Sequence, residues 1–519
     1  MALVTLKKLA LTFIALYLAR RVYWEATTGS RRRALKKRHG CLPNKELPTK
    51  NRFLVFGIDF IRRNIRAYKD HKLLEAWGAC LTDNNAHTIS MHVLGQSIFL
   101  TDDPENVKTI LATDFEKWSI GRERIKHISA YLGKGIFTTE GAAWKHSREM
   151  LRPCFERSQV ADISIMDNHT NRFMNLIPKD GTTIDLQPLF HQLTLDIATD
   201  FLFGKSTNAL DHSKGDIEVE EFIKAFEYCQ NPFLGEDEAR FGWFSEVLRQ
   251  WFSNRKFKIA TKTIADFTDK IIDEEIASKV SKDRAQPDRY VFLNELLSQT
   301  SDRIHVRSEL LNILLAGRDT TAALLSNVVW ELSRQPSITT RLRQEVAEHI
   351  GDEVPTYQQL KDMRYLKAII NESQRLYPIV PSNSREAIED TILPRGGGPD
   401  ESSPLFIPKR AYVAYHSYSM HRRPDIFGSD ADIFNPTRWL DEEREDGALR
   451  PGWAYLPFNG GPRICIGQQF ALTEAMFVVV RLLQTFPVME SRDDEVWREK
   501  MSLTCTGLGG CKVGLKSVN

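Results

Sequence analysis

One cysteine stands at the end of a glycine-rich loop, directly ahead of an apolar stretch. The loop runs from Phe458 to Gly467 (FNGGPRICIG), and a helical pattern begins near Gln468. The free amides and the dipole at a helix N-terminus favour a thiolate, and a thiolate can bind a metal ion. Glycines lack a Cβ, so the backbone can pass close to a large flat ligand. The guanidinium of Arg463 suits a carboxylate. These residue types predict a ligand that is flat, carries carboxylates and holds a metal.

Haem has all three properties. The pattern F-x-x-G-x-R-x-C-x-G is filled at every fixed position, by Phe458, Gly461, Arg463, Cys465 and Gly467. A lone cysteine is usually a small buried apolar residue, but this pattern resembles the haem-thiolate loop of the cytochrome P450 monooxygenases. The resemblance implies haem b as cofactor, with the thiolate of Cys465 as the axial ligand of the iron.

A second motif lies in a long helical pattern from Ile304 to Arg334, which Pro336 should end. At its centre stands Ala-Gly-Arg-Asp-Thr-Thr, residues 316–321. Threonine hydroxyls can bond to carbonyls one turn earlier and open the helix locally. The motif resembles the oxygen-activation motif of the same family. It implies that Thr320 donates a hydrogen bond to bound dioxygen and that Asp319 supplies protons, so both are candidate catalytic residues.

Three further positions match residues that meet the haem propionates in this family. Trp144 and Arg148 are four residues apart and therefore share one helical face. Arg385 follows an extended segment, 379–384, that would line the substrate pocket together with residues 503–508. The resemblance makes all three candidate cofactor-binding residues.

A structural cluster is expected from Glu372, Arg375 and Arg438. The first two form an E-x-x-R pair on one helical face and lie between the other motifs in the family's order, and the third follows where a second arginine completes the cluster. The acid that usually precedes this arginine is replaced by Thr437. One salt-bridge partner is therefore left without an assignment.

The order of the motifs predicts the fold. Length alone, 519 residues, allows two or three domains. The resemblance instead implies one large cytochrome P450 domain, mainly α with a small β-sheet region, over residues 51–519. Within it we expect a strand pair over 89–100, a helix starting at Pro104, a β-hairpin turn at the glycines 396–398 and a core helix over 468–484. Residues 215–300 correspond to the mobile lid over the substrate pocket.

The N-terminus predicts a membrane anchor over residues 1–28, followed by a basic and proline-bearing linker over 29–50. The apolar run from Leu9 to Ala19 is short for a span, and a cleaved signal peptide has a similar length. However, no small-residue cleavage site follows it. Basic residues accumulate downstream, so the catalytic domain should face the cytosol, at the endoplasmic reticulum membrane. Membrane lipid is thus an expected partner.

Bulk composition excludes several classes. The net charge is +2, which gives no basis for nucleic acid binding. The seven cysteines form no C-x-x-C pair, which argues against a zinc site or a disulfide framework. The chain also lacks a dinucleotide-binding G-x-G-x-x-G after a strand. The resemblance therefore implies a separate NADPH-dependent cytochrome P450 reductase, with cytochrome b5 as a second electron donor, and an apolar small-molecule substrate.

The motif regions, residues 311–322 and 461–475, resemble the fungal alkane and fatty-acid hydroxylases most closely, through Arg318 and the pair Gln468-Gln469. The expected function is hydroxylation of a fatty acid or n-alkane at or near the chain terminus, using dioxygen. A fungal oxygenase acting on polyketides or terpenoids remains an alternative. A haem-thiolate isomerase or a haem sensor is a more remote one, since neither needs Thr320 and Asp319.

Overall fold

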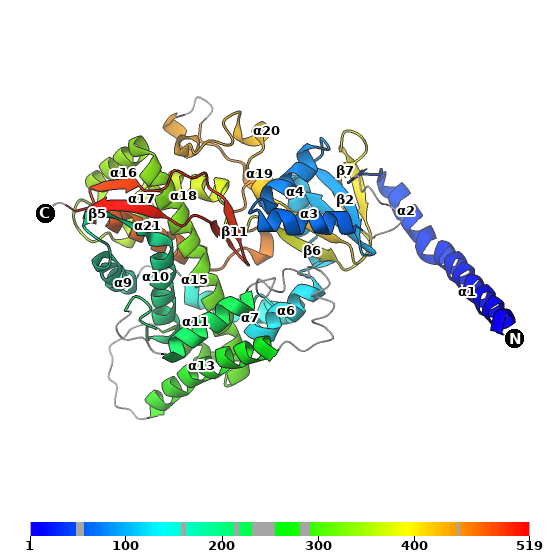
Figure 1. The fold of residues 1–519 in the computed structure, drawn as a ribbon, viewed down its shortest axis with the longest axis horizontal. Helices are drawn as coiled ribbons and strands as arrows, with labels where there is room; N and C mark the ends of the chain where they lie inside the picture. The colour runs from blue at the N-terminus through cyan, green and yellow to red at the C-terminus, as the bar shows by residue number, and fades with distance from the viewer. Residues whose placement is uncertain are drawn as a thin grey trace.

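The computed structural model describes residues 2–47, 57–156, 162–211, 217–230, 255–280, 291–443 and 447–517. It is mainly helical, with a region of small sheets. Figure 1 shows α15 (Arg303–Arg334) running through the helical part, the sheet region with α3 and α4 beside it, and α1 projecting away as a single helix. This arrangement confirms the predicted fold class. The expected lid lies partly outside the described residues, at 231–254 and 281–290.

The described body holds further helices. They are α3 (Ile58–Lys69), α4 (Leu73–Thr82), α5 (Pro104–Lys108), α6 (Arg122–Leu132), α7 (Gly141–Leu151), α9 (Ser164–Asn175), α10 (Leu186–Phe203), α11 (Ile217–Gln230), α13 (Arg255–Val280), α14 (Phe292–Gln299), α16 (Pro336–His349), α17 (Tyr357–Asp362), α18 (Arg364–Leu376), α19 (Ser417–Met420), α20 (Pro424–Phe427) and α21 (Gln468–Thr485). Among those that pack against α15 are α10, α13, α14, α16, α18 and α21. The start of α5 and the extent of α21 agree with the predictions.

The largest sheet has six strands in the order β1-β2-β3-β9-β6-β4. Its strands are β1 (Lys45–Glu46), β2 (Thr88–Val93), β3 (Gln96–Thr101), β4 (Trp118–Ser119), β6 (Asn383–Ala387) and β9 (Tyr412–Tyr415). The predicted strand pair is β2 and β3, which are antiparallel and joined at Leu94-Gly95, both with positive φ.

Three smaller sheets complete the β-structure, in the orders β10-β13-β5, β11-β12 and β7-β8. Their strands are β5 (Asp180–Asp185), β7 (Thr391–Gly397), β8 (Ser403–Ile407), β10 (Val488–Ser491), β11 (Glu499–Met501), β12 (Cys505–Gly507) and β13 (Lys512–Lys516). The predicted turn after Leu393-Pro394 therefore lies in a hairpin, β7 and β8, as expected.

The bounds of α15 follow from its sequence. The carboxylate of Asp302 accepts hydrogen bonds from the amides of Ile304 and His305, at 3.0 and 3.2 Å, and so caps the first turn. Pro336 disfavours helical geometry at the preceding residue and starts the next helix. Nearly every side chain between Val306 and Ser333 is buried. The long buried helix predicted over 304–334 is therefore confirmed.

α10 is the helix packed most extensively against α15. Its Thr194 hydroxyl donates a hydrogen bond to the carbonyl of Arg318, at 2.7 Å, inside the protein. A Cβ at Gly317 would lie in ordinary contact, 3.6 Å from the Cβ of Ala198. This contact fixes the centre of α15, where the Asp-Thr-Thr motif lies, relative to α10.

The N-terminal segment is helical from α1 (Ala2–Trp24) through a π-helical turn (Glu25–Gly29) to α2 (Ser30–His39), across the predicted boundary at residue 28. None of the helices in the described ranges combines the length and the apolar character that a bilayer crossing requires. α2 is fixed to the body because Arg32 pairs with Asp390 through two hydrogen bonds, at 2.9 and 2.8 Å. Within the predicted linker, residues 45–46 join the large sheet as β1.

Candidate active site

The cysteine loop is a compact turn held by its own backbone. The amide of Cys465 donates to the carbonyl of Phe458 at 3.0 Å, and the amide of Ile464 donates to the carbonyl of Gly461, also at 3.0 Å. Gly461 has a φ of 67°, and a Cβ there would lie 1.9 Å from the carbonyl oxygen of Leu111. Only glycine fits this close approach. A Cβ at Gly467 would make ordinary contact with Phe155, so protein packing does not require that glycine.

The Cys465 side chain is exposed to solvent, although protein atoms lie close around it. Burial raises the pKa of its thiol, while a hydrogen bond from the Gly467 amide and the charge of Arg148 lower it. The helix N-terminus alone thus does not produce a thiolate. A coordinated metal ion would, because it deprotonates a coordinating thiol.

Arg463 lies against the ring of Trp144, with its guanidinium carbon 4.5 Å from the ring centroid. It donates hydrogen bonds to the carbonyls of Thr139, at 2.8 Å, and Ile136, at 3.5 Å. Burial and the nearby charge of Arg385 lower the pKa of Arg463 to about 10. The guanidinium is therefore held in a fixed orientation in a site that already carries positive charge.

The sequence-predicted pair on α7 lies next to the loop. Trp144 is buried. The guanidinium carbons of Arg463 and Arg148 lie 4.5 and 6.0 Å from the centroid of its ring. Arg148 donates through Nη1 to the carbonyl of Ile464, at 2.9 Å, one residue before the cysteine. Burial lowers the pKa of Arg148, and the charge of Cys465 opposes this effect. The four-residue spacing on α7 thus brings both side chains to the cysteine loop, as the helical pattern predicts.

Arg385 lies on β6 and is buried. Its Nη1 donates to the side-chain oxygen of Asn383 at 3.1 Å, and the same oxygen accepts a hydrogen bond from Arg124 at 2.8 Å. Arg124, on α6, is a residue that the sequence analysis missed. Burial and the charge of Arg385 lower the pKa of Arg124 to about 10. A lone arginine in an amphipathic helix gives no signal of this kind in the sequence.

The site therefore gathers four guanidinium groups, from Arg124, Arg148, Arg385 and Arg463. In the described part of the chain, no carboxylate lies within ion-pair distance of any of them. Arg385 lowers the pKa of both Arg124 and Arg463, because like charges disfavour one another. Unpaired buried cations are costly unless an anion joins them. The donor set therefore fits the carboxylates of a haem, with the sulfur of Cys465 available to the iron.

The second candidate site lies at the centre of α15. The Thr320 hydroxyl donates to the carbonyl of Ala316 at 2.6 Å, one turn earlier, as the sequence predicts. Asp319 is buried, and its Oδ1 lies 3.4 Å from Nδ1 of His191 and 3.6 Å from Nε of Arg318. Burial alone would raise the pKa of Asp319, but the neighbouring His191 and the charge of Arg318 lower it below its usual value.

This acid is connected to the protein surface. Nη2 of Arg318 lies 2.5 Å from Oε1 of Glu227 on α11, and Glu227 is exposed. His191, on α10, is partly exposed. Neither partner was identified from the sequence, because both lie far from the motif along the chain. The structure brings Asp319, Arg318, Glu227 and His191 into one network.

The predicted structural cluster is present and fully buried. Glu372 makes paired hydrogen bonds with Arg375, at 2.8 and 2.9 Å, and accepts another from Nε of Arg438 at 2.9 Å. The acid missing at Thr437 is supplied by Asp430, whose carboxylate lies 3.0 Å from Nη2 of Arg438. The sequence pattern did not identify Asp430, because it lies eight residues before the arginine instead of one.

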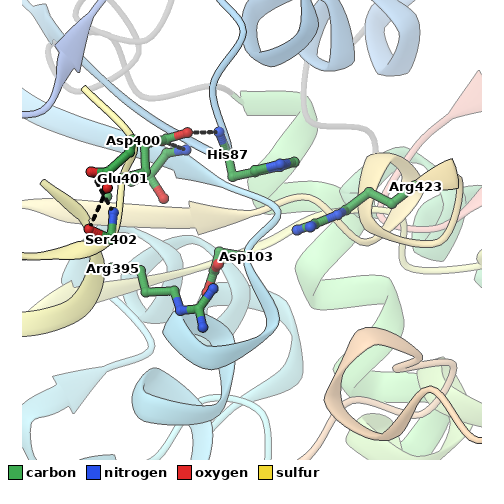
Figure 2. A pocket seen from close by; sticks show the side chains of 9 residues that line it. His87, Asp103, Arg395, Asp400, Glu401, Ser402 and Arg423 are labelled. Carbon is green, nitrogen blue, oxygen red and sulfur yellow. Dashed lines mark hydrogen bonds between the residues drawn. The ribbon is translucent and has the colours of Figure 1, made fainter. Parts of the chain in front are cut away.

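A polar cavity of about 200 Å³ lies in the sheet region. Figure 2 shows the side chains around it, which include His87 just before β2, Asp103 just before α5, Arg395 and Glu401 of the β7–β8 hairpin, and Arg423 just before α20. Its acids have structural roles, since Glu401 accepts the amides of His87 and Thr88, and Asp103 caps α5. None of its lining residues belongs to the cysteine loop or to α15.

Comparison with known proteins identifies the family. The cytochrome P450 family model matches residues 79–508, most of the chain. The crystal structure of a cytochrome P450DA heme domain superimposes with a TM-score of 0.75 at 20% identity, covering 92% of this chain and 98% of that one. At this identity the likeness establishes the fold. The chain belongs to the cytochrome P450 family.

Curated relatives with closer sequences are fungal. Cytochrome P450 monooxygenase himC of Aspergillus japonicus is 41% identical over 515 residues, which cover 97% of this chain and 89% of himC. Cytochrome P450 52-E3 of Starmerella bombicola is 42% identical over 472 residues, covering 88% of this chain and 89% of the relative. Cytochrome P450 52A4 of Candida maltosa is 42% identical over 451 residues, which cover 83% of this chain and 81% of the relative. The protein is a cytochrome P450 monooxygenase, and its family implies a haem-thiolate cofactor and a reductase partner.

Proposed function

We propose that this protein hydroxylates a fatty acid or n-alkane at or near the chain terminus, with dioxygen and electrons from an NADPH-dependent reductase. The observation that carries the oxygenase part is the convergence of Cys465, whose side chain is exposed, with four arginines that have no carboxylate partner among the described residues. Haem bound there would supply the oxygen-activating iron. The chain's own residues then hold the cofactor, supply protons and bind the substrate.

Cofactor binding is assigned to residues from four segments. Cys465 would hold the iron of the haem through its sulfur, and Phe458, Gly461 and Gly467 shape its loop. Arg463 and Arg148 bind carboxylates near Trp144, and Arg385 with Arg124 bind them from β6 and α6. Guanidinium groups suit this role because their paired donors match carboxylate geometry.

Proton supply is assigned to Asp319 and Thr320. A carboxylate whose pKa is held low by His191 and Arg318 releases its proton readily and must then be reprotonated. The imidazole of His191 can pass a proton to it, whereas the guanidinium of Arg318 keeps its own. His191 and the Arg318–Glu227 pair connect it to the exposed surface. The Thr320 hydroxyl can exchange its intrahelical bond to Ala316 for a bond to an oxygen ligand. In this account Asp319 passes protons inward and Thr320 directs them.

The two segments expected to line the substrate pocket lie together. The amide of Cys505 donates to the carbonyl of Ile379 at 2.9 Å, which joins 379–384 to 503–508. Next to this bond, Val380 and Leu503 expose 43% and 37% of their surface, so apolar area is available for a ligand. Each methylene buried there contributes about 0.8 kcal/mol, which favours a long apolar chain.

We further propose that the protein is attached to the endoplasmic reticulum membrane through residues 1–28, with the catalytic domain in the cytosol. The support is that α1 exposes its apolar side chains: Leu9, Leu11, Phe13, Ile14, Leu16, Tyr17, Leu18, Val22 and Tyr23. The basic α2 follows it, where anionic lipid headgroups would lie. The reductase, and cytochrome b5 as a second donor, would meet the protein on the same membrane.

The test is turnover in membranes that carry this chain and a fungal reductase, with NADPH and a panel of fatty acids and alkanes of graded length. Terminal or subterminal hydroxy products would support the proposal and fix the position attacked. Omitting NADPH is the control, because a haem-thiolate isomerase would still act without it.

A second candidate is an oxygenase for bulkier fungal products such as polyketides or terpenoids. The himC relative from a filamentous fungus matches this chain as closely as the yeast relatives do, so identity does not separate the two. The absence of any product from the panel, with normal haem-thiolate spectra, would favour this candidate. If Thr320→Ala left the protein's activity unchanged, a haem sensor would be favoured instead.

A further inference from the structure

Two buried polar side chains on α15 lie outside the oxygen-activation motif and have no role in the account above. Glu309 and Asn312 are three residues apart and therefore share one face of the helix. Both side chains are fully buried, with 0% of their surface exposed. Buried polar groups are costly unless they are hydrogen-bonded, so this pair calls for a structural reason.

Both side chains hold the loop between α6 and α7. Oε2 of Glu309 accepts a hydrogen bond from the amide of Ile136 at 3.2 Å, and Oδ1 of Asn312 accepts one from the amide of Phe137 at 3.0 Å. Nδ2 of Asn312 donates to the carbonyl of Leu132 at 3.2 Å. The loop is therefore tied to α15 where it leaves α6 and again at its middle.

The loop fits closely against the helix. A Cβ at Gly135 would lie 2.5 Å from Nδ2 of Asn312 and 3.1 Å from Oε2 of Glu309. The Thr138 hydroxyl braces the loop from inside, since it accepts from the amide of Gly135 at 2.9 Å and donates to the carbonyl of Gly133 at 2.8 Å. Small displacements of the loop would break several of these contacts at once.

The opposite side of the same loop holds Arg463. The carbonyls of Ile136 and Thr139 accept the hydrogen bonds from Arg463 that fix its guanidinium against Trp144. Ile136 thus bridges the two groups, because its amide binds Glu309 and its carbonyl binds Arg463. A continuous chain of contacts leads from α15 through the loop to a proposed carboxylate-binding arginine beside the cysteine loop.

We propose that Glu309 and Asn312 are positioning residues for the cofactor, which fix the 132–139 loop so that Arg463 is held in the orientation that binds a haem carboxylate. The inference rests on the proposed role of Arg463. It adds to that role a support on α15, where the helix otherwise carries the oxygen-activation residues. The same helix would then carry the oxygen-activation residues and support Arg463.

The test compares Asn312→Ala with a matched control, Asn327→Ala, in the full chain loaded with haem. Asn327 is also a buried asparagine on α15, but it accepts a hydrogen bond from Trp497 at 3.1 Å, on a different segment. The readout is the rate of haem transfer to apomyoglobin. In Asn312→Ala, the loss of the two buried hydrogen bonds to the loop should speed haem loss by about tenfold. In the control the change should be about twofold or less.

Three measurements separate positioning from general damage. Glu309→Gln keeps an acceptor oxygen for Ile136 and should retain haem like the wild type. Gly135→Ala pushes the loop from its own side and should reproduce the faster loss. Hydrogen exchange at the amides of Ile136 and Phe137 should increase in Asn312→Ala but not in Asn327→Ala. This exchange readout does not depend on enzyme activity.

Wild-type rates of haem loss in both Asn312→Ala and Gly135→Ala, with faster exchange in the loop, would overturn the inference. Equal haem loss in Asn312→Ala and Asn327→Ala would also overturn it, because any buried asparagine would then serve. A failure of haem binding itself would be visible in the wild-type protein and would instead contradict the proposed function.

Discussion

At the scale of single residues, the proton network around Asp319 gives a sharp expectation. The imidazole of His191, with Nδ1 at 3.4 Å from Oδ1 of Asp319, lowers the pKa of this carboxyl against the raising effect of burial. In His191→Ala the pKa of Asp319 should rise, so Asp319 would release its proton only at higher pH. The acid limb of the pH profile for NADPH-coupled product formation should shift upward.

The matched control for this change is His169→Ala. His169, on α9, likewise pairs with an aspartate: its Nε2 lies 2.9 Å from Oδ2 of Asp200 on α10. It does not contact Asp319. Its pH profile should keep the wild-type acid limb. An unshifted limb in His191→Ala would remove His191 from the proton path.

Glu309 predicts a pH-dependent stability. Burial raises the pKa of its carboxyl to about 7, from an ordinary value of 4.5. Burial and the stacked His146 lower the pKa of His305, which lies 3.8 Å away on the same helix, so His305 loses its charge at a lower pH than an ordinary histidine. The unfolded carboxyl ionises first, so this group's contribution to stability falls by about 3 kcal/mol as pH rises from 4.5 to 7.

Glu309→Gln removes this titration. Its thermal stability relative to the wild type should therefore increase steadily as pH rises through this range and level off above pH 7. Thermal unfolding of both proteins at matched pH values measures the difference. A constant difference across the range would mean that Glu309 does not titrate as stated.

The sequence identified residues whose type and spacing form a motif, and it missed those that join a site only through the fold. Arg463 and Cys465 are two positions apart in one loop, so the pattern finds them together. Arg124 and His191 are single residues on amphipathic helices, and nothing in their neighbourhood along the chain marks them. Their roles depend on which helix packs against which.

At the scale of elements, the buried cluster that joins α18 to the segment before the cysteine loop can be tested by removing one acid at a time. The Glu372 carboxylate accepts hydrogen bonds from both Arg375 and Arg438. Glu372→Ala leaves these two buried guanidinium groups without their carboxylate and should lower the free energy of unfolding by about 3–5 kcal/mol. Asp430 is partly exposed and pairs only with Arg438 in this cluster, so Asp430→Ala should cost about 1 kcal/mol.

Thr437→Ala is the control, because its hydroxyl bonds only to the neighbouring Asn435 side chain. Thermal unfolding midpoints of the three variants should fall in the order Thr437→Ala, Asp430→Ala, Glu372→Ala. An equal loss for Asp430→Ala and Thr437→Ala would show that Asp430 does not replace the missing acid.

Long elements were easier to predict than short ones for a physical reason. α15 has a capping Asp302, a stopping Pro336 and apolar residues over its whole length, so local signals agree with its burial. The short strands β4 and β6 pair across a large sequence separation, and their partners are chosen by the fold. Turn signals at Leu94-Gly95 and at the 396–398 glycines nevertheless located two hairpins correctly.

At the scale of the whole molecule, α1 projects from the body with its apolar side chains exposed (Figure 1). If these side chains contact lipid, the double change Leu11→Glu and Phe13→Glu should move the protein from the membrane to the soluble fraction, because charged groups resist transfer into an apolar phase. Flotation with vesicles of neutral and anionic lipid measures this.

The control places the same charges on the body, at the exposed side chains Ile433 and Val496. This Ile433→Glu and Val496→Glu protein should remain with the vesicles. Flotation of the α1 variant with the membrane would mean that other parts of the chain hold it there.

The central claim is that Cys465 is the axial ligand of a haem whose carboxylates bind the surrounding arginines. The most direct measurement is the absorption spectrum of the reduced protein with carbon monoxide, for the wild type and for Cys465→Ser. We predict the red-shifted Soret band of thiolate ligation in the wild type and its loss in the variant. A variant that kept this band, or a wild type that never showed it, would contradict the account.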